Sequence, residues 1–345
     1  MTTLISTDRA AAVELLRKGE IVALPTETVY GLAADALNPI AVAKIFEAKE
    51  RPRFDPLIVH LPNRDWLQKI ADLPEENQQL ISRLADRFWP GPFTIVLRKR
   101  QVVPEIVSAG LDTVALRISA HPVFAKIVQL FGNPLAAPSA NRFGRVSPTT
   151  AQHVLDELNG RIPLIIEAGP THYGLESTIV SVRGNNIDIL RRGPITAEKL
   201  SKFAKVNIVA PPARKISAPG QLSSHYAPRT PLRVVDNAES FSPLKNQRVG
   251  LLAWYAVTGK GDLQIPQRRT GDRRSLKFAA VRNLSAREDL REAAANFFRY
   301  LRELDQSDLD LIVAERVPSR GLGAAILDRL ERASHGQSVA PGRPE

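Results

Sequence analysis

Short apolar runs alternate with amphipathic helical patterns along the first 206 residues, and this alternation restricts the fold more than any other feature. Residues 21–25 (IVALP) and 57–61 (LIVHL) are typical of buried strands. Residues 39–50 repeat their apolar side chains at helical spacing after an early proline, and residues 76–88 are predicted to form a helix that stops at the following WPGP. This mixture of strands and helices predicts an α/β or α+β domain over residues 1–206.

A change of composition divides the rest of the chain. Residues 207–231 are rich in proline, serine and alanine and are predicted to form an extended linker. Residues 232–334 are predicted to form a second, smaller domain, in which RVGLLAW and LDLIVAE are strands of the parallel type and residues 287–305 form an amphipathic helix. GLGAA is interpreted as a closely packed helix start, and residues 335–345 are expected to fray.

The composition excludes several classes of protein. The chain has 345 residues and no cysteine, which excludes disulfides, cysteine nucleophiles and thiolate metal sites. No apolar run approaches the roughly 20 residues of a membrane helix, and the first residues lack the order of a signal peptide, so a cytoplasmic location is expected. The net charge of +11 fits either a polyanionic ligand or a basic surface that aids solubility.

Two polar segments lie next to strand-like runs in the first half. Thr26, Glu27 and Thr28 come directly after an apolar strand, where side chains can line a crevice or can simply satisfy the backbone of a turn. Lys49 and Arg51 lie in a proline-stiffened basic segment, which could grip a phosphate or could form a solvated loop. On spacing alone, the structural interpretation is favoured for both segments.

A third segment, APSANRFGRVSPTT, combines small polar residues with a glycine and a helix start. Ser139 and Asn141 flank an alanine, and Ser147 precedes a predicted helix. Such groups can cradle a phosphate or an oxyanion, although Ser147 followed by proline is equally typical of a helix cap. The chain contains no P-loop sequence, no GxSxG, no HExxH and no histidine cluster with metal spacing.

The order of the segments is more specific than any one of them. GEIVALPTETVYGLAADA, KERPRFDPLIVH, FWPGPFTIVL, TVALRIS, APSANRFGRVSPT, GLESTIV, RRGPI and PGQLSSHYAP follow one another along the chain. Together they resemble the long-form threonylcarbamoyl-AMP synthases over nearly the whole chain. The resemblance implies a YrdC-type catalytic domain with a twisted mixed sheet, a linker, and a smaller Rossmann-like domain with a parallel sheet.

The resemblance also implies an activity. L-threonine, bicarbonate and ATP, with Mg²⁺ accompanying the ATP, would give L-threonylcarbamoyl-AMP and pyrophosphate by nucleotidyl transfer. A partner transferase would then use the product to modify an adenosine of tRNA, and direct contact with tRNA stays open. In this reaction the amine of threonine gives a carbamate, and a carbamate oxygen attacks the α-phosphorus of ATP. Neither of these two steps requires a protein nucleophile, because both depend on positioning and on cancellation of negative charge. The carbamate is unstable in water, so a cover over the site is expected, with Tyr226 of the linker as the candidate lid residue.

The family pattern, carried over residue by residue, implies two neighbouring sites and no metal held by the protein. The threonine site consists of Thr28, His60, Arg117, Ala137 and Ser177. The ATP site consists of Lys49, Arg51, Asp55, Thr113, Ser139, Asn141, Ser147, Arg191 and Tyr226, of which Lys49 and Arg51 are the expected catalytic residues. Asp55 departs from the family, which more often has asparagine there. A carboxylate would repel phosphates unless it faces Mg²⁺ or is protonated.

Two other functions compete with this interpretation. A non-catalytic RNA-binding module would explain the net charge and the basic residues 267–277, although the first half has few aromatic residues for base stacking. A carbamoyl-transfer domain of the hydrogenase-maturation type would carry zinc-finger cysteines and an acylphosphatase segment, and this chain has neither.

Overall fold

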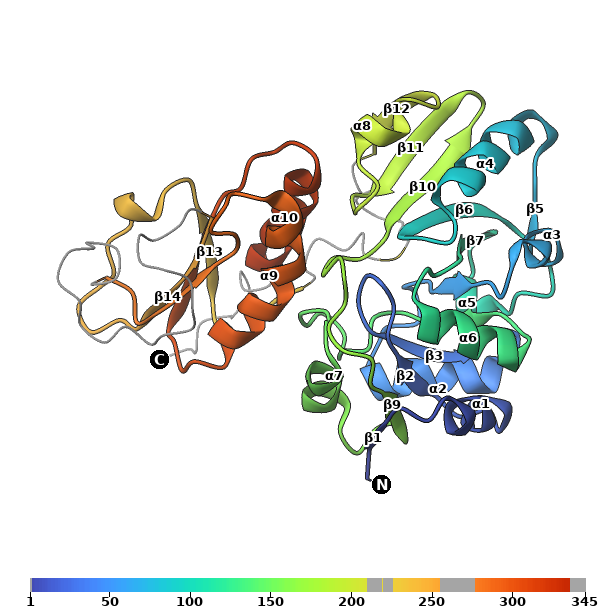
Figure 1. Ribbon diagram of the computed structural model, residues 1–345, viewed down its shortest axis with the longest axis horizontal. Helices are drawn as coiled ribbons and strands as arrows, with labels where there is room; N and C mark the ends of the chain where they lie inside the picture. The colour runs from blue at the N-terminus through green and yellow to red at the C-terminus, as the bar shows by residue number, and fades with distance from the viewer. Residues whose placement is uncertain (1, 210–218, 220–225, 255–276, 336–345) are drawn as a thin grey trace, which may run out of the picture. The chain divides into compact units, whose positions relative to one another are not determined.

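The chain forms two compact units in the computed structural model, which describes residues 2–209, 219, 226–254 and 277–335 (Figure 1). Unit 1 comprises residues 1–143 and 147–222, and unit 2 comprises residues 144–146 and 223–345. Most of the predicted linker, 207–231, and most of the predicted tail, 335–345, lie outside the described residues, as does most of the basic segment 267–277.

Unit 1 is built on a mixed sheet. Its elements are β1 (Leu4–Ser6), α1 (Arg9–Arg17), β2 (Val22–Leu24), β3 (Gly31–Asp35), α2 (Pro39–Lys49), β4 (Ile58–His60), η1 (Arg64–Trp66), α3 (Leu67–Ile70), β5 (Ala71–Asp72), α4 (Glu75–Phe88), β6 (Phe93–Lys99), α5 (Glu105–Ser108), β7 (Thr113–Arg117), α6 (Pro122–Phe131), β8 (Leu135–Ala136), α7 (Ala151–Leu158), β9 (Leu164–Ile166), β10 (Thr178–Arg183), β11 (Asn186–Arg191), α8 (Ala197–Leu200) and β12 (Lys205–Ile208). The strand order is β1-β9-β2-β3-β8-β4-β7-β6-β10-β11-β12, and β5 pairs with β6. Parallel and antiparallel pairs alternate irregularly, which confirms the predicted mixed α/β fold.

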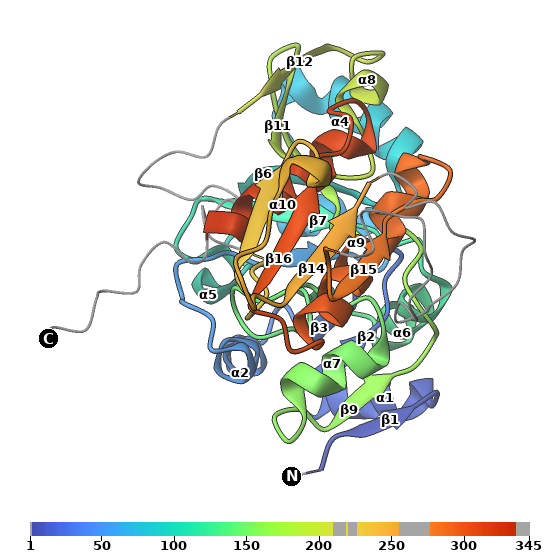
Figure 2. The ribbon, with the colours of Figure 1, turned by 90° about the vertical axis from the view of Figure 1, so that its left-hand side faces the viewer.

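Unit 2 is a smaller α/β unit. Its elements are β13 (Leu232–Val235), η2 (Ala238–Ser240), β14 (Val249–Ala253), β15 (Ala280–Asn283), α9 (Leu290–Asp305), β16 (Leu311–Glu315) and α10 (Leu322–His335). The strands run parallel in the order β13-β16-β14-β15, with α9 and α10 side by side against them (Figure 2). The parallel sheet confirms the predicted Rossmann-like architecture. The predicted close packing at the start of α10 is also confirmed, because a Cβ at Gly323 would lie 1.8 Å from the carbonyl oxygen of Pro318.

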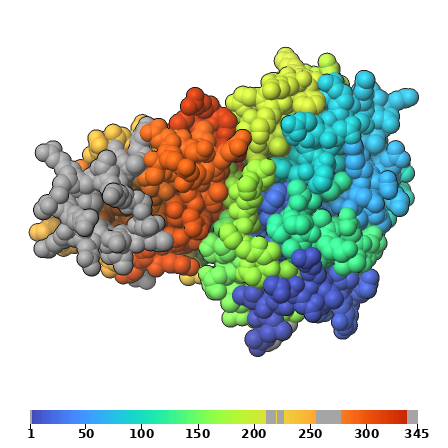
Figure 3. Space-filling view, in the orientation of Figure 1, coloured from blue at the N-terminus to red at the C-terminus, as the bar shows by residue number. Residues whose placement is uncertain are grey.

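Alternating side chains give the sheet of unit 1 two different faces. Val22 and Leu24 of β2 pack with α1 and α6, which adjoin each other as the dark blue and green surfaces in Figure 3. The intervening Ala23 belongs to the hydrophobic core on the opposite face, to which α2, α4 and α7 also contribute. Since successive side chains of a strand point to opposite faces, residues two apart share one face. None of the helices in the described residues is long and apolar enough to cross a membrane.

The end of α2 positions Lys49 and Arg51 of the basic segment that precedes β4. Asn38 caps the helix by accepting hydrogen bonds from the backbone N–H groups of Ile40 and Ala41, and Pro39 occupies its first turn. Glu50 ends the helix in a left-handed conformation with φ of 53°. The backbone N–H of the next residue, Arg51, still reaches the carbonyl of Phe46. Lys49 therefore stays in the last turn of α2, and the side chain of Arg51 reaches the carbonyls of Asp55 and Pro56 just before β4.

Six strands were not predicted from the sequence, namely β1, β3, β5 and β12 of unit 1 and β13 and β15 of unit 2. Each is short or poor in β-branched residues, and GLAAD of β3 has little intrinsic preference for a strand. They form because distant partners supply the hydrogen bonds. Strand β3 lies between β2 and β8, with Gly31 opposite Leu24 and Ala34 opposite Ala136.

Candidate active site

The turn between β2 and β3 is a compact network of hydroxyl groups. The Thr26 hydroxyl donates to the carbonyl of Val29 at 2.6 Å and accepts the backbone N–H groups of Thr28 and Val29. Its oxygen also lies 2.8 Å from the hydroxyl oxygen of Thr28. Thr26 therefore has the structural role expected of a turn residue, whereas the Thr28 hydroxyl reaches beyond the turn.

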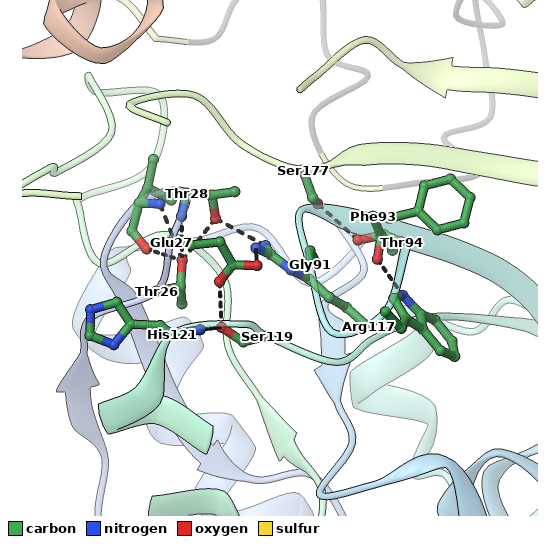
Figure 4. Close-up of polar contacts among 12 residues, drawn as sticks. Thr26, Glu27, Thr28, Gly91, Phe93, Thr94, Arg117, Ser119, His121 and Ser177 are labelled. Atoms are coloured by element: carbon green, nitrogen blue, oxygen red, sulfur yellow. Dashed lines mark hydrogen bonds and ion pairs between the residues drawn. The ribbon is translucent and has the colours of Figure 1, made fainter. Parts of the chain in front are cut away.

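Arg117, the last residue of β7, joins this turn to the sheet (Figure 4). Its Nη1 donates to the Thr28 hydroxyl at 3.0 Å, and its Nε donates to the carbonyl of Gly91 at 3.1 Å. Its Nη2 lies 2.7 Å from Glu27 Oε1, and the other oxygen of Glu27 accepts a hydrogen bond from Ser119. These contacts fix the guanidinium plane and bring two sequence segments about 90 residues apart into one cluster.

The Glu27–Arg117 pair is buried and charged. The side chain of Glu27 is 8% exposed and that of Arg117 is 4% exposed. Burial alone would raise the pKa of Glu27, but the Arg117 charge and the hydrogen bonds from Ser119 and Arg117 lower it to about 2. Glu27 is therefore ionised at neutral pH and balances the charge of Arg117.

His60 adds a neutral imidazole to this cluster. It lies opposite Arg117 in the β4–β7 pairing, and its ring packs 4.7 Å from that of Phe124 in α6. Burial and the charge of Arg117 lower the pKa of His60 to about 3, against the opposing effect of Glu27. Within the described part of the chain, its Nδ1 has no hydrogen-bond partner. A neutral ring with a buried, uncommitted nitrogen is suited to bind a polar ligand.

A second cluster joins β6, β10 and β11. The Ser177 hydroxyl lies 2.8 Å from that of Thr94 and accepts a hydrogen bond from Arg191 Nη2 at 3.1 Å. Arg191 Nε also donates to the carbonyl of Ser177. The β10–β11 pairing is shifted by a bulge between Ile179 and Val180, just before which Ile179 lies opposite Arg191. The structure thus joins Ser177 of the predicted threonine set to Arg191 of the predicted ATP set.

The predicted basic segment forms a third cluster, in which Lys49 contacts backbone and not solvent. Its Nζ donates to the carbonyl oxygens of Ser139, at 2.6 Å, and of Asn141. Lys49 is 1% exposed, and burial together with the nearby Arg51 charge lowers its pKa well below the usual range, although Asp55 and Glu157 act in the opposite direction. Lys49 therefore lies directly against the loop that carries Ser139 and Asn141.

Arg51 and Asp55 form a buried ion pair next to this loop. Arg51 Nη2 lies 2.8 Å from Asp55 Oδ2 and also donates to the carbonyl of Pro56. Asp55 is fully buried, and apart from this ion pair its carboxylate oxygens have no hydrogen-bond partner in the described residues. Burial raises the pKa of Asp55, although the charges of Arg51, Lys49 and Arg191 oppose this effect. The carboxylate thus lies among the cations predicted to bind phosphates.

Four predicted site residues remain, namely Ser147, Ala137, Thr113 and Tyr226. Ser147 is buried and donates to Glu176, the residue before Ser177. Ala137 is buried beside β4, where its backbone N–H donates to Ile58. Thr113 begins β7 and lies at the opposite end of that strand from Arg117. Tyr226 belongs to unit 2, where its ring packs against Phe298 and Arg329, and the preceding residues 220–225 lie outside the described part.

Four polar residues of these clusters were absent from the predicted site. They are Glu27, Thr94, Ser119 and Glu176. Glu27 and Glu176 each stand beside a predicted site residue in the sequence, and Ser119 is the last residue of VALRIS, which is predicted to be a strand. A polar residue at the end of a strand is the signal that could have indicated them. Among the described residues, no group of three or more histidine, aspartate or glutamate side chains could hold a metal ion.

The chain is similar to known proteins in both sequence and structure. Residues 14–193 match the family model described as "Telomere recombination", and residues 195–335 match "Threonylcarbamoyl-AMP synthase, C-terminal domain". The threonylcarbamoyl-AMP synthase of Pyrococcus abyssi is 39% identical over 94% of this chain and 93% of its own length, and that of Bacillus subtilis is 38% identical over 96% and 94%. The crystal structure of P. abyssi Sua5 with L-threonine is similar at a TM-score of 0.81, with 35% identity over 97% of this chain and 98% of that one.

Proposed function

The chain belongs to the threonylcarbamoyl-AMP synthase family, and from this membership we infer that it forms L-threonylcarbamoyl-AMP and pyrophosphate from L-threonine, bicarbonate and ATP. The reaction is a nucleotidyl transfer, in which AMP moves from ATP to a carbamate of threonine. Its product serves the modification of an adenosine in tRNA by a partner transferase. The complex of P. abyssi Sua5 with L-threonine supports the assignment of threonine as a substrate.

The Glu27–Arg117 cluster is the proposed threonine site. A zwitterionic amino acid carries one charge of each sign, and the cluster supplies one fixed charge of each sign. The carboxylate of threonine accepts hydrogen bonds from the N–H groups of Arg117. The Thr28 hydroxyl and His60 Nδ1 bind the remaining polar groups, with Ala137 and Ser177 at the edge of the site. Because the cluster is buried, these hydrogen bonds are stronger than they would be in water.

The basic clusters form the proposed nucleotide site. Arg51, Arg191 and the loop carrying Ser139 and Asn141 surround the phosphates, and Ser147 lies beside them. Mg²⁺ bound to ATP would withdraw charge from the phosphate oxygens. Thr113 is proposed to contact the nucleoside.

The chemistry requires orientation more than reactive side chains. The ammonium group of threonine releases a proton, and its nitrogen attacks the carbon of bicarbonate or CO₂ to give a carbamate; with bicarbonate, water leaves. A carbamate oxygen then attacks the α-phosphorus of ATP, the bond to the β-phosphate breaks, and pyrophosphate leaves. Cations placed around the phosphates stabilise the charge that develops on the leaving group.

The hydrogen bond from Arg191 to Ser177 carries this proposal, because it joins the two substrate sites at one point. The test measures pyrophosphate release and product mass with each substrate omitted in turn. Release should require threonine and bicarbonate, and release that is unchanged without threonine would refute the proposal. Arg191→Met should lower turnover at least a hundredfold, whereas Arg183→Met, at a position 80% exposed on β10, should leave it unchanged.

The alternative function is an RNA-binding module without catalysis. Its basic segment lies almost wholly outside the described residues, and the described part offers no specific observation in its favour. RNA affinity that falls steeply with salt, in a protein that shows no turnover, would support it over the synthase.

A further inference from the structure

The ammonium group of Lys49 is poorly placed to bind a phosphate. The residue is 1% exposed, and its ammonium group donates to two backbone carbonyls, those of Ser139 and Asn141. An ammonium group has three N–H bonds, so two of them are already committed inside the protein. A lysine that serves as a point charge for phosphate has to present its ammonium group to the ligand instead.

The same loop depends on Lys49 through the backbone as well. The backbone N–H of Phe143 donates to the carbonyl of Lys49 at 2.8 Å, so side chain and main chain hold opposite ends of the loop. Between them, the backbone N–H of Ala140 donates to the carbonyl of Tyr30, also at 2.8 Å. Residues 139–143, which we call the clamped loop, are therefore fixed from α2 on one side and from the turn after β2 on the other.

Moving the ammonium group to a phosphate would leave both carbonyls without this donor. Buried carbonyl groups are costly to leave unsatisfied, and residues 139–141 are buried or only partly exposed. Binding a phosphate through Lys49 would therefore disrupt the loop that carries two other residues of the proposed nucleotide site. Holding the loop and reaching the ligand are competing uses of one side chain, and the geometry favours the first.

We propose that Lys49 is a positioning residue, which sets the conformation of the clamped loop before ATP binds and does not itself bind the phosphates. This inference rests on the proposed function only for the identity of the ligand. Its structural part concerns the nucleotide-free protein and can be tested without any substrate.

The first experiment measures amide hydrogen exchange in the nucleotide-free protein. Lys49→Met keeps the length of the side chain and removes the donor, and it should speed exchange at Ala140 and Phe143 at least tenfold. Lys44→Met is the matched control on the same helix, because Lys44 pairs with Glu20 near the surface and its side chain is 33% exposed. The control should exchange like the wild type. Unchanged exchange in Lys49→Met, together with weaker ATP binding, would overturn the proposal.

The second experiment needs only the wild-type protein, so it stands even if Lys49→Met does not fold. Reductive methylation of amines is followed by mass spectrometry with and without ATP. A clamped Lys49 should stay unmodified in both conditions while Lys44 reacts in both. Rapid methylation of Lys49 that ATP suppresses would identify a direct phosphate ligand and refute the proposal.

A third comparison uses the absence of cysteine from the chain. Lys49→Cys can be alkylated selectively with 2-bromoethylamine in denaturant and refolded, which restores an amine at nearly the same reach. The alkylated protein should recover both slow exchange in the clamped loop and the KM for ATP. Recovery of the KM without recovery of slow exchange would contradict the positioning role. A wild type that releases no pyrophosphate would refute the proposed function and leave the exchange result intact.

Discussion

Replacing Glu27 by glutamine tests the central ion pair of the proposed threonine site. The change keeps the size of the side chain and removes the charge that faces Arg117. Arg117 would then be a buried cation without its carboxylate, and Ser119 would lose a charged acceptor. We expect a loss of stability at neutral pH together with a higher KM for threonine, because Thr28 and Arg117 lose their fixed geometry.

The magnitude follows from the pKa of Glu27, which falls from its ordinary value of 4.5 to about 2. At roughly 1.36 kcal/mol for each pH unit, the ionised carboxylate contributes about 3 kcal/mol to the free energy of unfolding at pH 7. Breaking a buried pair by removing one partner costs a similar amount, about 3–5 kcal/mol. Because the pKa is lower in the folded state, the contribution is fully present above about pH 5 and falls to about 1 kcal/mol at pH 3.

The assay is urea unfolding of wild type and Glu27→Gln at pH 7, 5, 4 and 3, followed by circular dichroism. The difference in unfolding free energy should be largest at pH 7 and should shrink as the pH falls. Glu20→Gln serves as control, since that surface carboxylate is 40% exposed and its pair with Lys44 should contribute less than about 1 kcal/mol. A difference at pH 7 below about 1 kcal/mol, or one that does not change with pH, would refute the reasoning.

Three further predictions concern other buried groups. Asp55→Asn should bind ATP about tenfold more tightly at pH 7, because the negative charge of Asp55 no longer repels the phosphates. A hydrogen bond would replace the ion pair with Arg51. Weaker ATP binding in calorimetry would contradict this prediction. Between pH 8 and pH 5, the unfolding free energy of the wild type should fall by about 2 kcal/mol more than that of His60→Gln. The reason is that a histidine with a pKa of about 3 stays neutral in the folded state but is protonated in the unfolded state. Equal losses in urea titrations would speak against this. Glu315→Gln should destabilise unit 2 by about 2 kcal/mol. The two carboxylate oxygens of Glu315 accept the backbone N–H groups of Ala238 and Trp254, and an amide has only one oxygen to accept them. An unchanged unfolding midpoint in the fluorescence of Trp254 would exclude a stabilising role of Glu315.

Most helices and buried strands could be predicted from the sequence because each leaves a local pattern. The apolar spacing of residues 76–88 and the following proline and glycine correspond closely to α4, which spans Glu75–Phe88. The helix predicted around residues 287–305 corresponds to α9. In both cases the buried face repeats with the helical period, which a reader of the sequence can recognise without knowing what covers it.

The site residues were identified through the resemblance of the whole chain, and their contacts were not predictable. Taken alone, the segment around Lys49 is more typical of a solvated loop than of a phosphate site. The structure buries Lys49 against carbonyls about 90 residues further along the chain. No local pattern encodes that partner, because the order of strands in the sheet decides which turns meet.

The sequence by itself therefore determined the class of fold, the parallel sheet of unit 2 and the family of the protein, since these depend on local periodicity and on the order of short segments. Only the tertiary structure decided that Glu27 neutralises Arg117, that Ser177 meets Arg191, and that Lys49 holds a loop. Those pairings depend on strand register and on burial, which set the distance between two charges and the dielectric that separates them.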